Sequence, residues 1–385
     1  MKPASTFLFA GGGTGGHLFP GIAIAAELRR RDPLAKMVFV GSTRSIEATI
    51  VAEQGLEHRM LSVESLPMLK RNPFRFLYRN WQACRAATRL LQELSPAAVI
   101  GLGGYASAPL VWAASRRRIP VVLIEQNVIP GRTTRWLSRY AQQVCVSFPE
   151  TISQLTRARH ATVTGNPVRA EIAALLDRSR VVSGMTTAEK IPAEKIPAEN
   201  SSTAPRELLI LGGSQGADSL NAAVFAALPK LAASLSDWKM VHQTGPRDVE
   251  KARRVYEELG LTAEVAPFFH EMSELYRRAS LVISRSGATT LAELACAGTA
   301  MVLLPYPFAA DDHQRANAQV FLDQHAALIV KHVEPPQRTA DQLEAALRSL
   351  LDDPDRRIAM GRAATELAHP RAAEQIADVI AAVQG

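Results

Sequence analysis

Short apolar runs alternate along both halves of the chain with longer segments in which apolar residues recur every three or four positions. Such short runs are typical of strands buried on both faces, and the longer segments are typical of helices. We predict strands at residues 7–10, 37–40, 97–100, 120–124 and 143–146, and again at 207–211, 239–242, 263–266, 281–284 and 300–304. This alternation predicts an α/β fold with parallel sheets that carry helices on both faces.

The alternation stops between residues 177 and 205, where Ala-Glu-Lys-Ile-Pro occurs twice in succession within residues 188–197. A proline at every fifth position forbids a regular helix, and little apolar surface is available to bury. Because a chain of 385 residues is too long for one ordinary core, we expect a linker here between two domains. Further helices are predicted at 22–28, 220–228, 340–351 and 355–383, the last interrupted by Pro370.

Residues 11–16 follow the first predicted strand, contain five glycines and lead into His17. A strand, a glycine turn and a helix together bring bare backbone N–H groups to a phosphate, and residues 212–216 repeat this arrangement. The spacing of the glycines matches the dinucleotide fingerprint, but no acidic residue follows the second strand to hold a ribose. The sequence therefore argues against a nicotinamide or flavin cofactor. It leaves an anion or sugar site, or a tight turn without a ligand.

His17 stands at the predicted start of a helix, where the helix dipole favours a neutral imidazole. A neutral histidine can take a proton from an attacking hydroxyl, although a capping histidine without chemistry fits the local sequence as well. Ser286 is predicted to cap a second helix whose first N–H groups, at 288–290, would bind another anion. Glu293, further along that helix, is suited to accept the hydroxyls of a ribose.

Residues 66–81 interleave large apolar side chains with Lys70, Arg71, Arg75 and Arg79. The pattern is typical of a segment that lies on an anionic membrane, and equally of an amphipathic core helix with a solvated basic face. Single-stranded nucleic acid is a third interpretation, but no nucleic-acid module accompanies the segment. The apolar residues of the predicted membrane patch are Leu69, Phe74, Phe76, Leu77 and Trp81.

The net charge of +7 favours an anionic partner, namely a nucleotide, a nucleic acid or an acidic lipid surface. No apolar run approaches the ~18 residues that span a bilayer, and the N-terminus does not resemble a secretory signal. The three cysteines are scattered and give no disulfide or metal framework, which fits reduced thiols in a cytosolic protein. Asp312, His313, Gln314 and Asn317 cluster, but no second group has suitable spacing for a metal.

Taken together, these motifs form an ordered series along nearly the whole chain. The series is Gly-Gly-Thr-Gly-Gly-His17 with Phe-Pro-Gly21, Gly-Gly-Tyr105, Glu-Gln-Asn127, Gly-Asn-Pro-Val-Arg169, Gly-Gly-Ser-Gln-Gly216, Ser-Gly-Ala288 with Glu293, and Asp-x-Gln314 with Asn317. Each motif alone is weak, whereas the ordered set is specific. The chain resembles the GT-B glycosyltransferases and, within them, the MurG-type peptidoglycan transferases.

The resemblance implies two Rossmann-like domains whose parallel sheets face each other across a cleft. They would comprise an N-terminal acceptor and membrane domain at 1–168, a linker at 169–205, a UDP-sugar domain at 206–365, and a C-terminal helix at 366–385 that packs back on the first domain. The implied activity is inverting, metal-independent transfer of N-acetylglucosamine from UDP-N-acetylglucosamine to the 4-hydroxyl of N-acetylmuramoyl-pentapeptide on undecaprenyl diphosphate. This step converts lipid I into lipid II and serves peptidoglycan synthesis, cell shape and cell division.

No cofactor and no nucleic acid are expected. The implied partners are UDP-N-acetylglucosamine, lipid I, an anionic membrane surface at the cytoplasmic face of the inner membrane, and other cell-wall synthesis proteins. A GT-B-fold UDP-sugar epimerase and a non-catalytic, nucleotide-sugar-sensing membrane scaffold remain as alternatives. Two departures from the family pattern are Ile124, where some members have histidine, and the long tandem at 188–200.

The resemblance also implies roles for individual residues. His17 is the candidate base, with Glu125 as the alternative. The glycine turn would help to hold the donor and place the acceptor, and its end would aim His17 at the incoming hydroxyl. The other implied substrate contacts are Thr14, Gly15, Gly16 and Asn127 for donor and acceptor, Arg169, Ser214, Ala288, Thr289, Thr290 and Leu291 for the diphosphate, Phe269 for uracil, Glu293 for ribose and Gln314 for the sugar.

Overall fold

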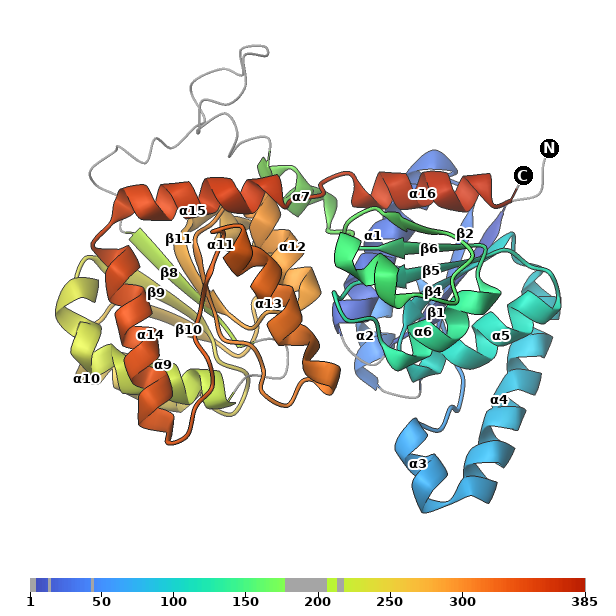
Figure 1. Ribbon diagram of the computed structural model, residues 1–385, viewed down its shortest axis with the longest axis horizontal. Coiled ribbons are helices and arrows are strands. Elements are labelled where there is room, and N and C mark those ends of the chain that lie inside the picture. The colour runs from blue at the N-terminus through green and yellow to red at the C-terminus, as the bar shows by residue number, and fades with distance from the viewer. Residues whose placement is uncertain (1–4, 13–14, 43–44, 177–205, 213–217, 385) are drawn as a thin grey trace, which may run out of the picture. The chain divides into compact units, whose positions relative to one another are not determined.

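The computed structural model describes residues 5–12, 15–42, 45–176, 206–212 and 218–384. The chain divides into two compact units, Met1–Arg169 with Arg371–Gly385, and Ala170–Pro370. Each unit is a parallel sheet with helices packed on it (Figure 1). Thr14, Ser214 and the tandem at 188–200 lie outside the described residues.

The sheet of the first unit has, among the described residues, seven parallel strands in the order β3-β2-β1-β4-β5-β6-β7. They are β1 Thr6–Gly11, β2 Lys36–Gly41, β3 Glu57–Met60, β4 Ala98–Gly103, β5 Val121–Glu125, β6 Gln143–Val146 and β7 Ala161–Val163. In β1, Phe7 and Phe9 enter the core on one face of the sheet, and Leu8 and Ala10 enter the core on the other. Burial on both faces explains why the central strands are continuous apolar runs.

The helices of this unit are α1 Gly15–Arg31, α2 Ser45–Glu53, α3 Leu66–Arg71, α4 Pro73–Leu94, α5 Ala108–Arg116, α6 Arg132–Leu137 and α16 Ala372–Ala382, with short 3-10 turns η1 Tyr105–Ser107, η2 Ser138–Tyr140 and η3 Pro149–Gln154. The last helix, α16, lies beside α1 (Figure 1). Ile376 and Ile380 join the core that α1 covers, and Arg31 Nη1 lies 2.6 Å from Asp378 Oδ1.

The second unit contains, in the part of the chain that is described, a six-stranded parallel sheet in the order β10-β9-β8-β11-β12-β13. Its strands are β8 Arg206–Leu211, β9 Trp238–Gln243, β10 Ala263–Ala266, β11 Ala279–Ser284, β12 Met301–Leu303 and β13 Leu328–Ile329. Its helices are α7 Ala170–Ala173, α9 Asp218–Leu231, α10 Val249–Glu258, α11 Met272–Arg278, α12 Ala288–Ala297, α13 His313–Asp323, α14 Pro336–Leu351 and α15 Pro354–Glu366, with η5 Ala232–Leu235 and η6 Ala310–Asp312.

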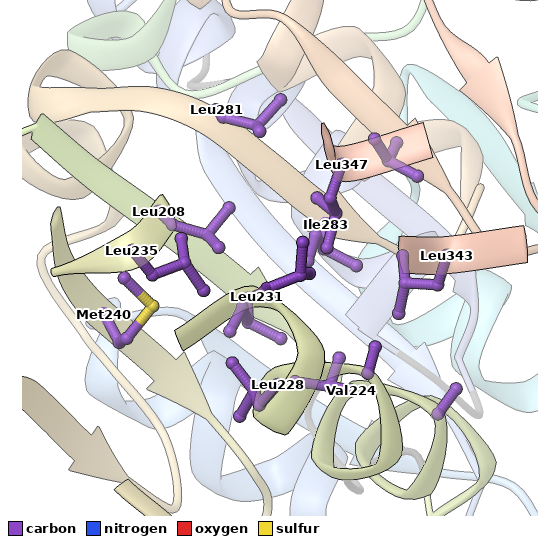
Figure 2. Packing of buried hydrophobic residues seen from close by; sticks show 14 of the residues in the cluster. Leu208, Val224, Leu228, Leu231, Leu235, Met240, Leu281, Ile283, Leu343 and Leu347 are labelled. Carbon is purple, nitrogen blue, oxygen red and sulfur yellow. The ribbon is translucent and has the colours of Figure 1, made fainter. Parts of the chain in front are cut away.

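The core of the second unit lies where α9 and α14 cover one face of this sheet. Figure 2 shows Leu228 and Leu231 of α9 and Leu343 of α14 meeting Leu208 of β8 and Ile283 of β11. All of these side chains are at most 2% exposed.

The ten strands predicted from the sequence are confirmed in position, and the α/β fold with parallel sheets is as expected.

Both sheets reverse their strand order next to their first strand. In the first sheet β1 lies between β2 and β4, and in the second β8 lies between β9 and β11. Ligands of open parallel sheets bind at the carboxyl ends of the strands at such a switch point. Gly12 and Gly212, which directly follow β1 and β8, and the start of α12 after β11 all lie there.

Candidate functional site

His17 is the third residue of α1, at the carboxyl ends of β1 and β4. Helix α1 begins at Gly15, earlier than predicted, and includes Pro20, so His17 occupies its first turn. The half-buried imidazole places Nδ1 3.2 Å from Gln126 Oε1. On its other side the ring lies against Gly103, where an added Cβ would come within 3.2 Å of His17 Cε1. The ring is thus held between the ends of β4 and β5.

Glu125, the last residue of β5, is only 2% exposed. Its Oε1 accepts hydrogen bonds from the Asn127 backbone N–H at 3.1 Å and the Asn127 side-chain amide at 3.3 Å. Its Oε2 accepts from the Gly131 N–H at 3.0 Å. The carboxylate therefore organises the loop after β5 and orients Asn127, while its neighbour Gln126 faces His17.

Further residues of the predicted site lie around the first turns of α1. Gly15 and Gly16 begin the helix, where backbone N–H groups have no intrahelical acceptor. The Arg169 guanidinium carbon lies 5.7 Å from the centre of the Phe19 ring, two residues after His17. The structure thus places Arg169 beside the first turns of α1, which carry Gly16 and His17.

The N-terminus of α12 is a second helix start at the carboxyl end of a strand, after β11. Its N-cap is Gly287, and no side chain caps it, so the prediction that Ser286 caps this helix is wrong. The Ser286 hydroxyl instead donates to the Gln314 carbonyl at 2.8 Å, which ties α13 to the start of α12. The first turn of α12, with the N–H groups of Ala288, Thr289 and Thr290, carries the positive end of the helix dipole and is suited to an anion.

Arg285 lies directly before this helix and was not predicted to take part in the site. Its Nη1 donates to the Leu304 carbonyl at 2.8 Å, and its Nη2 donates to the Ser219 hydroxyl at 2.6 Å. Burial lowers the pKa of Arg285 to about 10, so the guanidinium keeps its charge at neutral pH. It joins the ends of β11 and β12 to the first turn of α9 and places a positive charge at this edge of the sheet.

Glu293 lies on α12 and is 7% exposed. Its Oε2 accepts a hydrogen bond of 2.8 Å from the hydroxyl of Tyr276, a buried residue of α11 that the sequence analysis did not single out. Two other predicted contacts are engaged within the unit. The Phe269 N–H donates to Gln243 Oε1 at 3.2 Å, and Gln314 Oε1 accepts from the Tyr306 N–H at 2.9 Å.

The predicted membrane segment forms two helices that meet at Asn72, which caps α4 by accepting from the Arg75 N–H. Leu69 is 41% exposed, Phe74 84%, Leu77 61% and Trp81 54%, whereas Phe76 is half-buried. Figure 1 shows α3 and the first turns of α4 projecting from the rest of their unit. A core helix would bury these apolar side chains. Helix α4 packs into the core only further along, and its buried residues are Ala83, Ala87, Leu90 and Leu91.

No helix among the described residues is sufficiently long and apolar to cross a bilayer. Within the same residues, no three His, Cys, Asp or Glu side chains are grouped so as to hold a metal ion. His313, part of the cluster considered from the sequence, has its Nδ1 2.7 Å from the Ala310 carbonyl oxygen. Burial raises the pKa of the Cys145 and Cys296 thiols to about 12, as expected for inert structural cysteines.

Comparison with known proteins gives matches along both units. The glycosyltransferase family 28 N-terminal domain matches residues 7–146, and the family 28 C-terminal domain matches residues 207–376. Curated relatives from Pelobacter propionicus and Geobacter sulfurreducens are each 38% identical over 97% of this chain and 98% of their own length. Both are named UDP-N-acetylglucosamine--N-acetylmuramyl-(pentapeptide) pyrophosphoryl-undecaprenol N-acetylglucosamine transferase.

Among solved structures, MurG of Acinetobacter baumannii matches with a TM-score of 0.72 and 28% identity, over 98% of this chain and 99% of that one. The UDP-N-acetylglucosamine 2-epimerase of Neisseria meningitidis, over 98% of this chain and 100% of that one, matches with a TM-score of 0.65 but only 13% identity, so that likeness concerns the fold alone. The matches to both domains and the identity along nearly the whole length show that the chain belongs to glycosyltransferase family 28, among its MurG-type N-acetylglucosaminyltransferases.

Proposed function

We propose that the chain transfers N-acetylglucosamine from UDP-N-acetylglucosamine to the 4-hydroxyl of N-acetylmuramoyl-pentapeptide on undecaprenyl diphosphate, which converts lipid I into lipid II. Relatives that are 38% identical along 98% of their length are named for this transfer. The structural observation that carries the proposal is the imidazole of His17, held at the switch point of the first sheet. An acceptor hydroxyl needs a base of this kind.

In the proposed reaction the acceptor oxygen forms a bond to the anomeric carbon of the α-linked donor. The bond from that carbon to the β-phosphate oxygen breaks, and its electron pair leaves with UDP. Direct displacement inverts the centre and gives a β-1,4 linkage. His17 takes the acceptor proton. We prefer it to Glu125 because N–H groups of Asn127 and Gly131 already donate to both oxygens of that carboxylate.

The departing UDP gains negative charge on its β-phosphate. In the proposal the first turn of α12, from Ala288 to Leu291, stabilises this charge with its backbone N–H groups and the positive end of the helix dipole. Arg285, fixed at the same edge, adds positive potential. The family resemblance implies a diphosphate contact for Arg169 as well. A single preorganised donor of this kind commonly lowers a reaction barrier by ~3 kcal/mol. Several such donors together are therefore enough to stabilise the leaving UDP in the proposed metal-independent reaction.

The remaining donor contacts are proposed from the family resemblance. Glu293, oriented by Tyr276, accepts the ribose hydroxyls, and the Phe269 carbonyl accepts from the uracil N–H while the Phe269 N–H stays on Gln243. Gln314, together with Thr14 and Asn127, contacts the transferred sugar, and Ser214 contacts the diphosphate. These assignments follow the family resemblance and the places of Glu293, Phe269 and Gln314 in the second unit.

The exposed apolar side chains of α3 and α4 support a peripheral membrane location. Phe74, Leu77 and Trp81 would enter the acyl boundary, and neighbouring arginines would meet lipid phosphates. The acceptor is anchored in the membrane by its undecaprenyl chain, so a patch on the acceptor side keeps the enzyme at its substrate. We therefore propose that the protein works at the cytoplasmic face of the cell membrane.

The test is transfer of labelled N-acetylglucosamine to a lipid I analogue in vesicles that contain anionic lipid. Label in the lipid product, dependent on the acceptor, would support the proposal. Epimerised sugar nucleotide formed without acceptor would instead indicate the epimerase alternative. Binding of UDP-N-acetylglucosamine without any turnover would indicate the scaffold alternative.

A further inference from the structure

Gln126 stands between two residues of the predicted site and has no role in the chemistry described so far. Its side chain is only 2% exposed and makes two hydrogen bonds. The amide Nε2 lies 3.1 Å from the carbonyl oxygen of Leu102 in β4, and the amide Oε1 lies 3.2 Å from His17 Nδ1. Gln126 therefore connects the end of β5 to the end of β4 and to the first turn of α1.

These two contacts determine the direction of the amide. A backbone carbonyl oxygen can only accept a hydrogen bond, so the NH₂ group of Gln126 must face Leu102. The opposite orientation would place two acceptor oxygens against each other in a buried site, at the cost of an unsatisfied polar group. The Gln126 Oε1 therefore faces His17.

The direction of the amide in turn determines the tautomer of His17. Oε1 is an acceptor only, so His17 Nδ1 must carry a hydrogen and donate it. In the neutral imidazole the second nitrogen, Nε2, then holds the lone pair. Free imidazole side chains in water prefer the other tautomer, in which Nε2 carries the hydrogen and cannot take a proton.

Gly103 supports the ring from a second direction. Its φ of +96° is a conformation that side-chain-bearing residues avoid, and an added Cβ would lie 3.2 Å from His17 Cε1 and 3.3 Å from Nδ1. The ring therefore packs directly on the backbone of β4 next to Leu102. Packing sets the plane of the imidazole, and the Gln126 amide sets which nitrogen is protonated.

We propose that Gln126 is a positioning residue that holds neutral His17 in the Nδ1–H tautomer and so makes Nε2 the atom that accepts the acceptor proton. This inference rests on the proposed function, because it gives His17 the role of base. Gln126 itself does not touch the reacting atoms. As a neutral amide it selects the tautomer without adding a negative charge next to the imidazole.

The first test measures the tautomer directly. Long-range ¹H–¹⁵N spectra of protein labelled in its histidines distinguish protonated from unprotonated ring nitrogens, and a His17→Gln variant assigns the His17 signals. We expect Nδ1 protonated and Nε2 unprotonated in the neutral ring of the unaltered protein. A signal that shows Nε2–H would overturn the inference, and this measurement does not depend on whether any Gln126 variant folds.

The second test uses Gln126→Met, which keeps the volume but offers no acceptor. We expect the His17 signals to move toward the Nε2–H tautomer and kcat to fall on the order of 10²-fold with the KM for the donor little changed, as for the loss of a general base. Gln154→Met is the matched control. That glutamine donates to the Val128 carbonyl in the same unit but does not contact His17, so its replacement should leave tautomer and kcat unchanged.

A Gln126→Met protein that keeps both the Nδ1–H tautomer and normal kcat would overturn the inference. Failure of the proposed function has a different signature. The unaltered protein would then show no transfer to the lipid I analogue, whatever the tautomer of His17.

Discussion

His242, at the carboxyl half of β9, should make the stability of the second unit depend on pH. Its ring is completely buried, with Nδ1 2.9 Å from the Tyr256 hydroxyl and Nε2 3.2 Å from Asn221 Oδ1. The Asn221 amide group donates to the Thr244 carbonyl and to Asp248, so its oxygen must accept from His242 Nε2–H. Nδ1 then accepts from Tyr256, and the ring is held neutral.

Burial lowers the pKa of His242 from 6.5 to about 3, although Asp248 acts in the opposite direction. Below pH 6.5 the unfolded chain therefore binds a proton that the folded chain does not bind, and stability falls as the pH falls toward 3. With these two values, the loss of unfolding free energy between pH 7 and pH 5 is about 2 kcal/mol. The contribution is fully present above pH 6.5.

The change to make is His242→Gln, which removes the titrating ring and keeps one donor and one acceptor. Urea unfolding of the variant and the unaltered protein is followed by tryptophan fluorescence in buffers from pH 5 to pH 7 at constant ionic strength. The difference in unfolding free energy between the two proteins cancels other titrating groups. We expect this difference to shrink by about 2 kcal/mol from pH 7 to pH 5.

Tyr256→Phe is the control for loss of a buried hydrogen bond. It keeps the imidazole and should lower the stability by about 1–3 kcal/mol at every pH. A stability difference between His242→Gln and the unaltered protein that stays constant across the pH range would refute the reasoning. It would mean that His242 is protonated in the folded protein, and the hydrogen-bond assignment through Asn221 would fall with it.

Four shorter predictions concern the proposed activity. His17→Ala should lower kcat by on the order of 10²-fold or more with donor affinity by calorimetry little changed, and near-normal turnover would rule out the base role. Glu293→Ala should chiefly weaken UDP binding, and an unchanged calorimetric affinity would remove it from the ribose. Because helix amides and arginines are proposed to stabilise the leaving UDP, transfer should survive EDTA; loss of activity that a divalent ion restores would contradict this. Replacing both Phe74 and Trp81 by serine should weaken binding to anionic vesicles by roughly tenfold or more, as measured in flotation assays. Unchanged binding would argue against the membrane patch.

The central strands were predictable because burial on both faces makes each of them a continuous apolar run. The strands missed from the sequence lie at the edges of the sheets. β3 has the sequence Glu-His-Arg-Met, whose side chains are partly solvated, and β13 has two residues. What makes such a segment a strand is its hydrogen bonding to a neighbouring strand, as β3 pairs with β2. That pairing leaves no pattern of apolar residues in a segment so short.

The predicted site shows the same limit at the level of side chains. The motifs located His17, Glu293 and the start of α12, because glycine turns and helix starts are local features. Ser286 was assigned as a cap by a local rule, but its hydroxyl bonds to Gln314, which is distant in sequence. Tyr276, which orients Glu293, and Arg285, which bridges two strand ends, act through similar long-range contacts. No spacing rule along the chain indicates such partners.

Glu125 and Gln126 illustrate how the fold gives neighbouring residues different tasks. Both belong to one motif, and on chemistry alone the carboxylate of Glu125 is the better partner for a histidine. The structure turns Glu125 toward the N–H groups of Asn127 and Gly131, and it turns the neutral amide of Gln126 toward His17. For His17 as the proposed base, a neutral partner orients the ring without adding a negative charge that would hold the accepted proton on the imidazole. In the second unit, where an anion is proposed to leave, the strand ends instead present Arg285 and the N-terminus of α12.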